Sequence, residues 1–205
     1  MREGLSSQEV SDQELSDQGT GLTVVSNADL REGDLPFAWY ALHTRHQHEK
    51  LVARSLVCKG FEIFLPQYNV VRKWSDRTKQ ITLPLFPCYV FVRGGLDKRL
   101  AVLTTPGVHG FVGFAGHAAP IPENEIEAVR KAAQNATIEP HPFLKCGDRV
   151  RVISGPLEGV EGVLVRKKNS FRLVLSLELL SRSAAVEVDA SAVERVRTPA
   201  RVPWK

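Results

Sequence analysis

The sequence predicts a chain of two parts, an α+β sandwich followed by a small β-barrel. The first observation is the order strand, helix, strand, strand, helix, strand, helix between residues 37 and 134, which favours helices packed on a sheet with antiparallel strands. The second is a run of short alternating segments between residues 145 and 197. The third is Gly-Pro-Leu-Glu-Gly at 155–159, whose glycines suit the tight reversal that a small barrel needs.

The first part begins with a strand and a helix. Residues 39–42 predict a strand because of their aromatic content. The spacing of Thr44 and Gln47 fits a capping box, so we expect a helix to start there. Apolar residues then recur on one helical face, and Gly60 is placed to end the helix.

The later elements of the first part follow from apolar runs and prolines. A basic, polar segment at 72–80 separates two strands. Pro106 forces an end soon after the second helix, and Pro122 opens the third. In chain order we predict a strand at 62–65, a strand at 83–92, a helix at 96–103, a strand at 108–114, a helix from 122 to about 135 and a linker at 135–145.

The second part predicts strands in short segments. They are residues 150–152, 155–163, 171–179 and 186–188, of which the second begins with the turn at 155–159. Leucine and glutamate in the third segment also favour a helix, so pattern and propensity conflict there. Gly and Pro at 155–162 would destabilise a helical hairpin by about 1 and 3 kcal/mol apiece. We therefore expect a barrel that keeps its fold and tumbles independently of residues 37–134.

Composition bounds the class of protein. The chain has 205 residues and 43% apolar content, enough for one domain or two small ones. We expect no membrane span and no signal peptide, and hence a cytoplasmic protein. Cys58, Cys88 and Cys146 are odd in number and lack the close pairing of a zinc site, so we expect buried, reduced thiols.

Charge is unevenly distributed along the chain. Residues 1–36 contain two basic and eight acidic residues. Because the whole chain carries +4, the rest carries about +10, an excess that favours contact with a polyanion. A basic surface that serves only solubility is the alternative. The acidic stretch has almost no aromatic or periodic apolar content, so we expect a disordered tail at 1–36.

No motif indicates an enzyme. The glycines at 107, 110, 113 and 116 match neither the dinucleotide fingerprint nor a P-loop, and we interpret them as strand-end turns. We find no nucleophile elbow, paired-carboxylate site or metal cluster, and expect neither cofactor nor metal.

Two sets of residues carry a resemblance to the NusG family of transcription elongation factors. The barrel segment resembles the family's KOW module. Residues 39–42, 85–92 and 105–114 are similar to three stretches of its N-terminal domain, in the same order and spacing. The resemblance covers residues 37–197 and implies an N-terminal domain at 37–134, a linker at 135–145 and a KOW barrel of the SH3-like type at 146–198. Residues 39–50 resemble the specialised UpxY and RfaH type.

The resemblance implies a contact with RNA polymerase. Phe86, Pro87 and Phe114 would form an exposed apolar depression that grips the clamp helices, and His43 matches an aromatic contact position although it is not a tyrosine. The alternative is that these residues are core. An exposed apolar patch on a basic chain makes a protein partner physically reasonable.

Two basic segments are candidates for nucleic-acid contact. We expect Arg45, His46 and His48 in the first helical turn, where the macrodipole disfavours cations. Two interpretations stay open: these residues bind an anion from outside the protein, or they form a solvated face with no binding role. By resemblance their positions match those that read the nontemplate DNA strand. A zinc site of His43, His46 and His48 is not favoured, because no Cys or acidic pair is placed to help. Arg72, Lys73 and Trp74 form a basic segment suited to single strands.

The barrel also has candidate partner-binding residues. Leu179, Leu180 and Arg182 match positions with which the family binds a small-subunit ribosomal protein and Rho. Core packing is the alternative for Leu179, whereas Arg182 is expected to be exposed. The sequence thus predicts a monomeric, non-enzymatic elongation regulator. The rival class is a ribosome-associated or RNA-binding KOW protein, and side-by-side exposure of Phe86 and Phe114 would discriminate between them.

Overall fold

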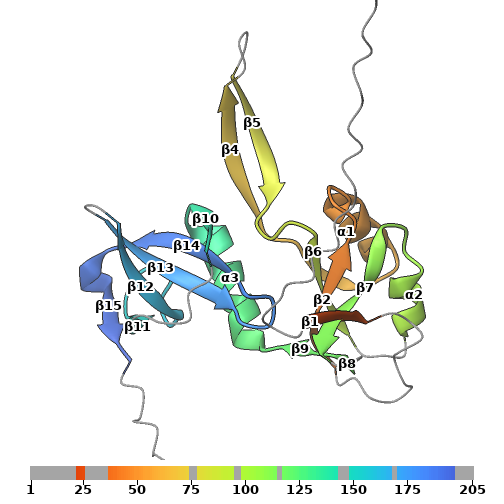
Figure 1. Ribbon diagram of the computed structural model, residues 1–205. Coiled ribbons are helices and arrows are strands. Elements are labelled where there is room, and N and C mark those ends of the chain that lie inside the picture. Colours follow the sequence, from red (N-terminus) through yellow and green to blue (C-terminus); the bar gives the residue numbers. More distant parts are fainter. Residues whose placement is uncertain are drawn as a thin grey trace, which may run out of the picture.

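The computed structural model describes residues 22–25, 37–73, 78–94, 98–114, 117–142, 148–167 and 170–196. They form an N-terminal lobe and a C-terminal barrel, with helix α3 (Glu123–Asn135) between the two (Figure 1). The predicted fold class, an α+β sandwich followed by a small barrel, is confirmed.

The N-terminal lobe is built on one antiparallel sheet in the order β1-β7-β2-β6-β3, with β8 paired to β7 and β9 to β2. The predicted strand at 108–114 is confirmed residue for residue. The strands are β1 (Leu22–Val25), β2 (Ala38–Thr44), β3 (Glu62–Phe64), β6 (Tyr89–Gly94), β7 (Val108–Phe114), β8 (His117–Ala118) and β9 (Pro120–Ile121).

The two faces of this sheet are covered differently. Side chains alternate along a strand, so neighbours in β2 belong to different cores. Tyr40 and Leu42 pack with helices α1 (Glu49–Cys58) and α2 (Arg99–Leu103) on what we call the two-helix face. Trp39 and Ala41 belong to the other cluster, which includes α3 and the barrel, and we call this the barrel-side face.

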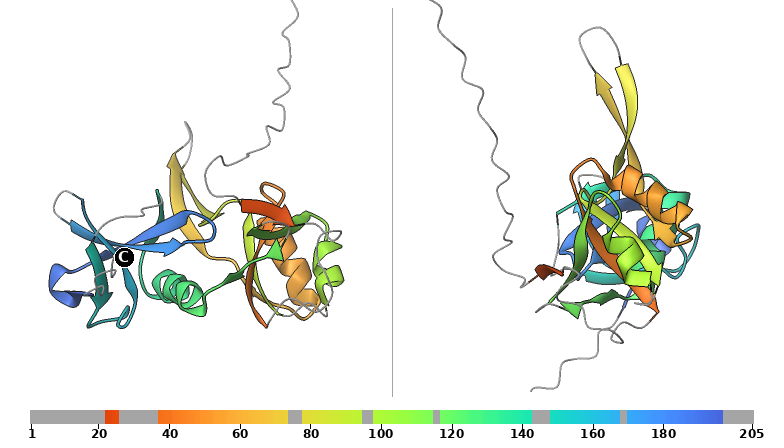
Figure 2. Two further views of the ribbon diagram at one scale, coloured as in Figure 1. Left: turned by 60° about the horizontal axis from the view of Figure 1, so that its bottom comes forward. Right: turned by 90° about the vertical axis from the view of Figure 1, so that its right-hand side faces the viewer.

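Strands β4 (Gln67–Lys73) and β5 (Thr78–Pro84) form a separate two-stranded hairpin. It projects away from both lobes (Figures 1 and 2). Lys50 Nζ at the start of α1 donates to the carbonyl of Thr82 at 2.7 Å, which ties the hairpin to the lobe. The strand predicted at 83–92 is wrong as one piece, because a turn at 85–88 separates β5 from β6.

The barrel sheet has the strand order β10-β14-β13-β12-β11-β15. Leu173, Leu175 and Leu177 belong to one core cluster, as the predicted alternation requires, but Val174 between them is buried as well. Gly155 (φ 90°) and Gly159 (φ 82°) adopt the left-handed conformation that the turn requires. The strands are β10 (Ile138–His141), β11 (Asp148–Val152), β12 (Glu161–Lys167), β13 (Ser170–Leu177), β14 (Arg182–Val188) and β15 (Val193–Arg195), with a 3-10 turn at Ala190–Ala192.

The barrel is in contact with the N-terminal lobe through α3. Buried residues of the sheet, of α3 and of β13 form one continuous cluster. The backbone N–H of Glu178 donates to Glu125 Oε2 at 3.2 Å, and Lys131 Nζ donates to the carbonyl of Glu158 at 3.4 Å. These contacts contradict the expectation that the barrel tumbles independently, because apolar residues of α3 are buried against it.

Two segments expected to be unstructured contain strands. Within the predicted tail, residues 22–25 form β1 on β7, while the rest of 1–36 lies outside the described residues. Val25 is buried there, so a short apolar run sufficed for pairing. Within the predicted linker, residues 138–141 form β10 on β14. Pro140 is tolerated because β10 is an edge strand.

The first helix starts later than predicted. Thr44 ends β2 and its Oγ1 is buried without a hydrogen bond, so it caps nothing, and α1 begins at Glu49. The end at Gly60 (φ 84°) is confirmed. The second helix, predicted from residue 96, begins only at Arg99 with Lys98 as its N-cap, and its end at Leu103 is confirmed. The third, with Pro122 as its N-cap, is confirmed.

The glycines around β7 differ from the expectation. Gly107 (φ 93°) is in a turn, as predicted. Gly110 and Gly113 are inside β7, where a Cβ would approach carbonyl oxygens of Val25 and His117 to 2.5 and 1.8 Å. They permit close approach of neighbouring strands, whereas Gly116 lies outside the described residues.

Candidate functional site

The predicted apolar depression is not found at Phe86. Phe86 is 2% exposed and its ring meets the ring of Phe91 edge-on at 6.0 Å. Phe86 therefore belongs to the core of the barrel-side face, and the expected side-by-side exposure with Phe114 is wrong. The physical reason is that the turn at 85–88 folds inward, with the Leu85 N–H donating to the carbonyl of Pro66 at 2.9 Å.

Phe114 and Pro87 are exposed, but at different places. Phe114 is 43% exposed at the end of β7, and Pro87 is exposed in the 85–88 turn. His43 pairs with Gly110, four residues before Phe114, which corresponds to about 13 Å along the strand. The structure thus brings Pro87 near His43, since His43 pairs with Tyr89, and leaves Phe114 apart.

His43 lies in an aromatic cluster on the barrel-side face. Its ring contacts the rings of Tyr89 and His109, with centroids 5.7 and 5.3 Å away. Burial lowers the pKa of His43, and the neighbouring His109 lowers it further. His109 was missed by the sequence reasoning because β2 and β7 shift register there, with His43 opposite Gly110 but Thr44 opposite Val108. Such a bulge re-aims a side chain.

Arg45, His46 and His48 form a turn that precedes α1. Arg45 and His46 are exposed, and His48 is the N-cap without a side-chain hydrogen bond. The expectation that all three stand in the first helical turn is wrong, because Gln47 has φ 62° and helical geometry begins only at Glu49. The Arg45 N–H donates to the carbonyl of Gly107 at 2.8 Å, which fixes this turn beside β7.

Cys88 and Glu49 lie against this turn. His46 Nδ1 is 3.7 Å from Cys88 Sγ, and the Cys88 N–H donates to Glu49 Oε1 at 2.8 Å. Burial raises the pKa of the Cys88 thiol and Glu49 raises it further, whereas Arg182 lowers it. The absence of a Cys or acid near the histidines, expected from the sequence, is wrong. Sequence separation hid Cys88, because β2 and β6 pair and bring the 85–88 turn back to residue 44.

The cysteines differ from the expected buried thiols. Cys58 at the end of α1 is exposed, and Cys88 is half-buried. Cys146 lies outside the described residues.

The hairpin carries part of the second basic segment. Arg72 and Lys79 are paired across the two strands and both are exposed. Lys73 ends β4 opposite Thr78, and Trp74 lies outside the described residues. The hairpin therefore presents cations on an extended arm, as the composition of the segment indicated.

The candidate partner residues of the barrel lie in its β13–β14 turn. Leu180 is buried, Leu179 is half-buried against the same cluster, and Arg182 is exposed as predicted. Ser181 between them has φ 49°. Because the N–H of Glu178 in this turn donates to Glu125 Oε2, the turn lies against α3.

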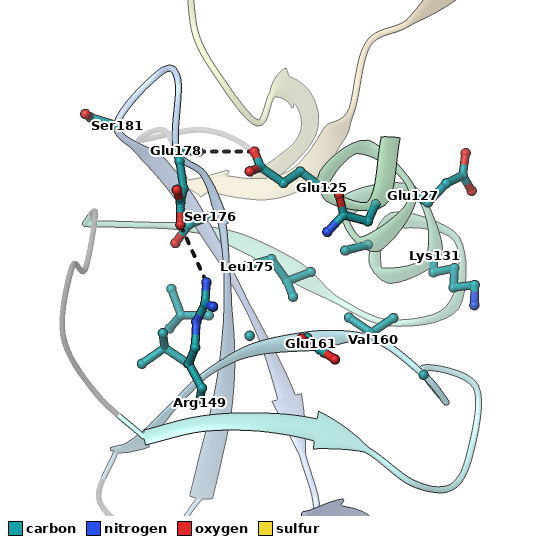
Figure 3. Close-up of a pocket in the computed structure, with 16 residues that line it drawn as sticks. Glu125, Glu127, Lys131, Arg149, Val160, Glu161, Leu175, Ser176, Glu178 and Ser181 are labelled. Atoms are coloured by element: carbon teal, nitrogen blue, oxygen red, sulfur yellow. Dashed lines mark hydrogen bonds and ion pairs between the residues drawn. The ribbon is translucent and has the colours of Figure 1, made fainter. Parts of the chain in front are cut away.

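A cavity of about 700 Å³ separates α3 from the barrel. Figure 3 shows Glu125 of α3 directed toward Glu178 and Arg149 of the barrel, with Glu178 and Arg149 3.5 Å apart. Burial is the main cause that raises the pKa of Glu125 to about 7. Neighbouring Glu178 adds to the increase, while its backbone hydrogen bond and Arg149 oppose it. Among the described residues, no helix has the length and apolar character needed to cross a membrane.

A family model and several curated relatives match this chain. The family model "Transcription termination factor nusG" matches residues 37–130. The transcription termination/antitermination protein NusG of Pseudomonas aeruginosa is 32% identical over 174 residues, covering 77% of this chain and 98% of that protein. NusG of Staphylococcus carnosus is 27% identical over 175 residues, covering 77% and 95%.

Among solved structures, Thermotoga maritima NusG, reported as showing a domain interaction, has a TM-score of 0.48. Its identity is 23%, and the match covers 78% of this chain and 97% of that one. The family assignment rests on the sequence relatives, since the Pseudomonas protein is matched over nearly its whole length. This chain belongs to the NusG family of transcription factors.

Proposed function

We propose that this protein regulates transcription elongation, by antitermination or suppression of pausing, as a monomer in the cytoplasm and as a specialised family member of the UpxY and RfaH type. The observation that carries the proposal is the 32% identity to a transcription termination/antitermination protein over 98% of that protein. The N-terminal lobe binds the clamp helices of RNA polymerase, and the barrel recruits a second partner. Binding one polymerase conformation better than another shifts its population toward that conformation.

The polymerase contact of this proposal lies on the barrel-side face. His43 contacts the Tyr89 ring, Pro87 is exposed in the turn just before Tyr89, and Phe114 is an exposed apolar side chain of the same lobe. Phe86 contributes by packing in the core against Phe91 rather than by direct contact, since it is buried. Exposed apolar side chains of this kind serve protein contacts.

A co-purification experiment tests the polymerase contact. The double variant Pro87→Ala/Phe114→Ala is expected to keep its melting curve and lose RNA polymerase. Leu100→Ala is the matched control, because Leu100 is 54% exposed on α2, which covers the opposite face. Polymerase retained equally by the double variant and the control would reject this contact.

The nucleic-acid contact of the proposal uses the 45–48 turn and the hairpin. Arg45 and Arg72 are exposed, and Lys50 links the two elements at the base of the hairpin. Binding to single-stranded DNA weakens as salt is added. Each phosphate contact that a substitution removes should reduce the slope of log affinity against log salt concentration by roughly 0.7. Arg45→Gln and Arg72→Gln are expected to show this reduction on nontemplate-strand DNA. Arg166→Gln, exposed on β12, is the control.

The barrel partner of the proposal is a small-subunit ribosomal protein or Rho. It would contact Leu179, Leu180 and Arg182, of which Leu180 is buried in the described structure. Access to Leu180 therefore requires the β13–β14 turn to leave the cluster that contains α3. Once the N-terminal lobe is bound to polymerase, its covalent link to the barrel raises the effective concentration of the barrel near its own partner. This favours binding of that partner.

The burial of Phe86 gives weight to a second candidate, a ribosome-associated or RNA-binding KOW protein without polymerase contact. Sedimentation separates the two functions. A tagged protein that migrates with ribosomes and never with polymerase would favour the second candidate, whereas polymerase recovered from ribosome-free fractions would favour the first.

A further inference from the structure

Three side chains with metal-binding atoms meet beside the 45–48 turn. They are His46 in that turn, Glu49 at the start of α1 and Cys88 in the 85–88 turn, and one ligand atom from each lies within 4.8 Å of the others. Cys88 is 39 residues from Glu49 along the chain and farther from His46. Tertiary structure therefore creates the cluster. It is the one such group among the residues that the structure describes.

The distances suit a tetrahedral metal ion. His46 Nδ1 and Cys88 Sγ are 3.7 Å apart. A zinc ion with its usual bonds to nitrogen and sulfur, at tetrahedral angles, separates these two atoms by about 3.6 Å. The two atoms therefore need almost no movement to share an ion, and a Glu49 carboxylate oxygen lies within 4.8 Å of both.

Glu49 is held in place as a third ligand. The residue is 3% exposed, and its Oε1 accepts the N–H of Cys88 at 2.8 Å. A carboxylate has about four lone-pair positions, so one hydrogen bond leaves the second oxygen free to bind a cation. The same hydrogen bond joins the Glu49 carboxylate to the backbone of Cys88. Supporting contacts of this kind orient the ligands of metal sites.

The backbone around the cluster is fixed in uncommon conformations. Gln47 (φ 62°) and Cys88 (φ 66°) are two of the three non-glycine residues with positive φ in the described structure. The N–H of Thr44 donates to the carbonyl of Cys88 at 2.8 Å, which fastens the two turns together. Such conformations persist where the surroundings determine them, and they gather at functional sites.

The ligand set selects the class of metal. Magnesium and calcium prefer oxygen ligands, whereas a thiolate with an imidazole and a carboxylate suits zinc. The start of α1 disfavours cations through its macrodipole, but the two anionic ligands, thiolate and carboxylate, neutralise a divalent ion. Because only three protein ligands converge and His46 is exposed, the fourth position faces solvent.

We propose that His46, Glu49 and Cys88 bind one Zn²⁺ ion, with a water molecule as the fourth ligand. Binding releases the proton of the Cys88 thiol to solvent. The ion cross-links the 45–48 turn to the 85–88 turn and so fixes the position of Arg45 and Pro87.

Zinc titration against a chromophoric chelator tests the site in the full-length protein. The wild type is expected to bind one equivalent, and Cys88→Ser, His46→Gln and Glu49→Gln are each expected to weaken binding by at least about 100-fold, the upper end of what loss of an outer-shell partner causes. The matched controls are Cys58→Ser and His117→Gln, both exposed positions outside the cluster. Equal affinity of the Cys88 and Cys58 variants would overturn the proposal.

Cobalt spectroscopy identifies the sulfur ligand. The chain has 3 cysteines, so the double variant Cys58→Ser/Cys146→Ser leaves Cys88 as the sole thiol. A thiolate-to-cobalt charge-transfer band in this variant supports the site, and its absence overturns it. Should Cys88→Ser fail to fold, His46→Gln still decides, because His46 is exposed and its loss disturbs no packing.

Discussion

The two faces of the N-terminal sheet are covered by different parts of the molecule. The two-helix face is covered by α1 and α2, which come from the same lobe and are joined to the sheet by short connections. The barrel-side face is covered by α3, which packs in turn against the barrel. One face is therefore closed by local chain order, while the other depends on a contact between the N-terminal lobe and the barrel.

The largest expected effect concerns the barrel-side core. Phe86→Ala should lower the free energy of unfolding of the N-terminal lobe by about 3 to 5 kcal/mol, because a fully buried ring leaves a cavity. Phe114→Ala, at 43% exposure, should change it by no more than about 0.5 kcal/mol. Chemical denaturation of both variants measures the difference. Equal effects would contradict the assignment of Phe86 to the core and of Phe114 to the surface.

The second prediction concerns the pH dependence of barrel docking. The pKa of Glu125 is raised to about 7 in the docked state, above its ordinary value near 4.5. The docked state then binds the extra proton, so docking is favoured below about pH 4.5 and is lost as the pH rises through about 7. Each pH unit in this window should weaken docking by at most about tenfold.

A distance label pair between α3 and β12, read across about pH 5 to 8, measures this docking equilibrium. Glu125→Gln should remove the pH dependence and remain docked, since it cannot ionise. Glu127→Gln is a matched control on the same helix. Docking that is independent of pH in the unmodified chain would contradict this prediction and show that Arg149 and the backbone N–H of Glu178 offset the charge of Glu125.

The third prediction tests how far β1 contributes to the two-helix face. Gly110→Ala places a Cβ 2.5 Å from the carbonyl oxygen of Val25, so β1 must shift. We expect a loss of about 1 to 3 kcal/mol, as for other overpacked sites. Gly94→Ala is the control, because a Cβ there meets nothing within 4 Å. Hydrogen exchange of the β1 amides should rise in the first variant alone.

Local pattern was sufficient for the elements whose stability is local. The 108–114 strand, the glycine turn of the barrel and the end of the first helix at Gly60 were all predicted from residue types alone, because each depends on neighbours in the chain. The start of that helix was not, since Thr44 is drawn into β2 and the capping box never forms. Strand pairing outweighed a local capping preference.

The sequence by itself determined the two-part architecture, the basic character of the hairpin and the family resemblance, because alternation, turn residues and motif spacing are properties of short segments. Only the tertiary structure decided which side of a turn is buried. Phe86 and Pro87 are adjacent in the chain, yet one is core and the other exposed. It also decided that Cys88 meets His46, since contacts between distant segments depend on strand register, which no single segment specifies.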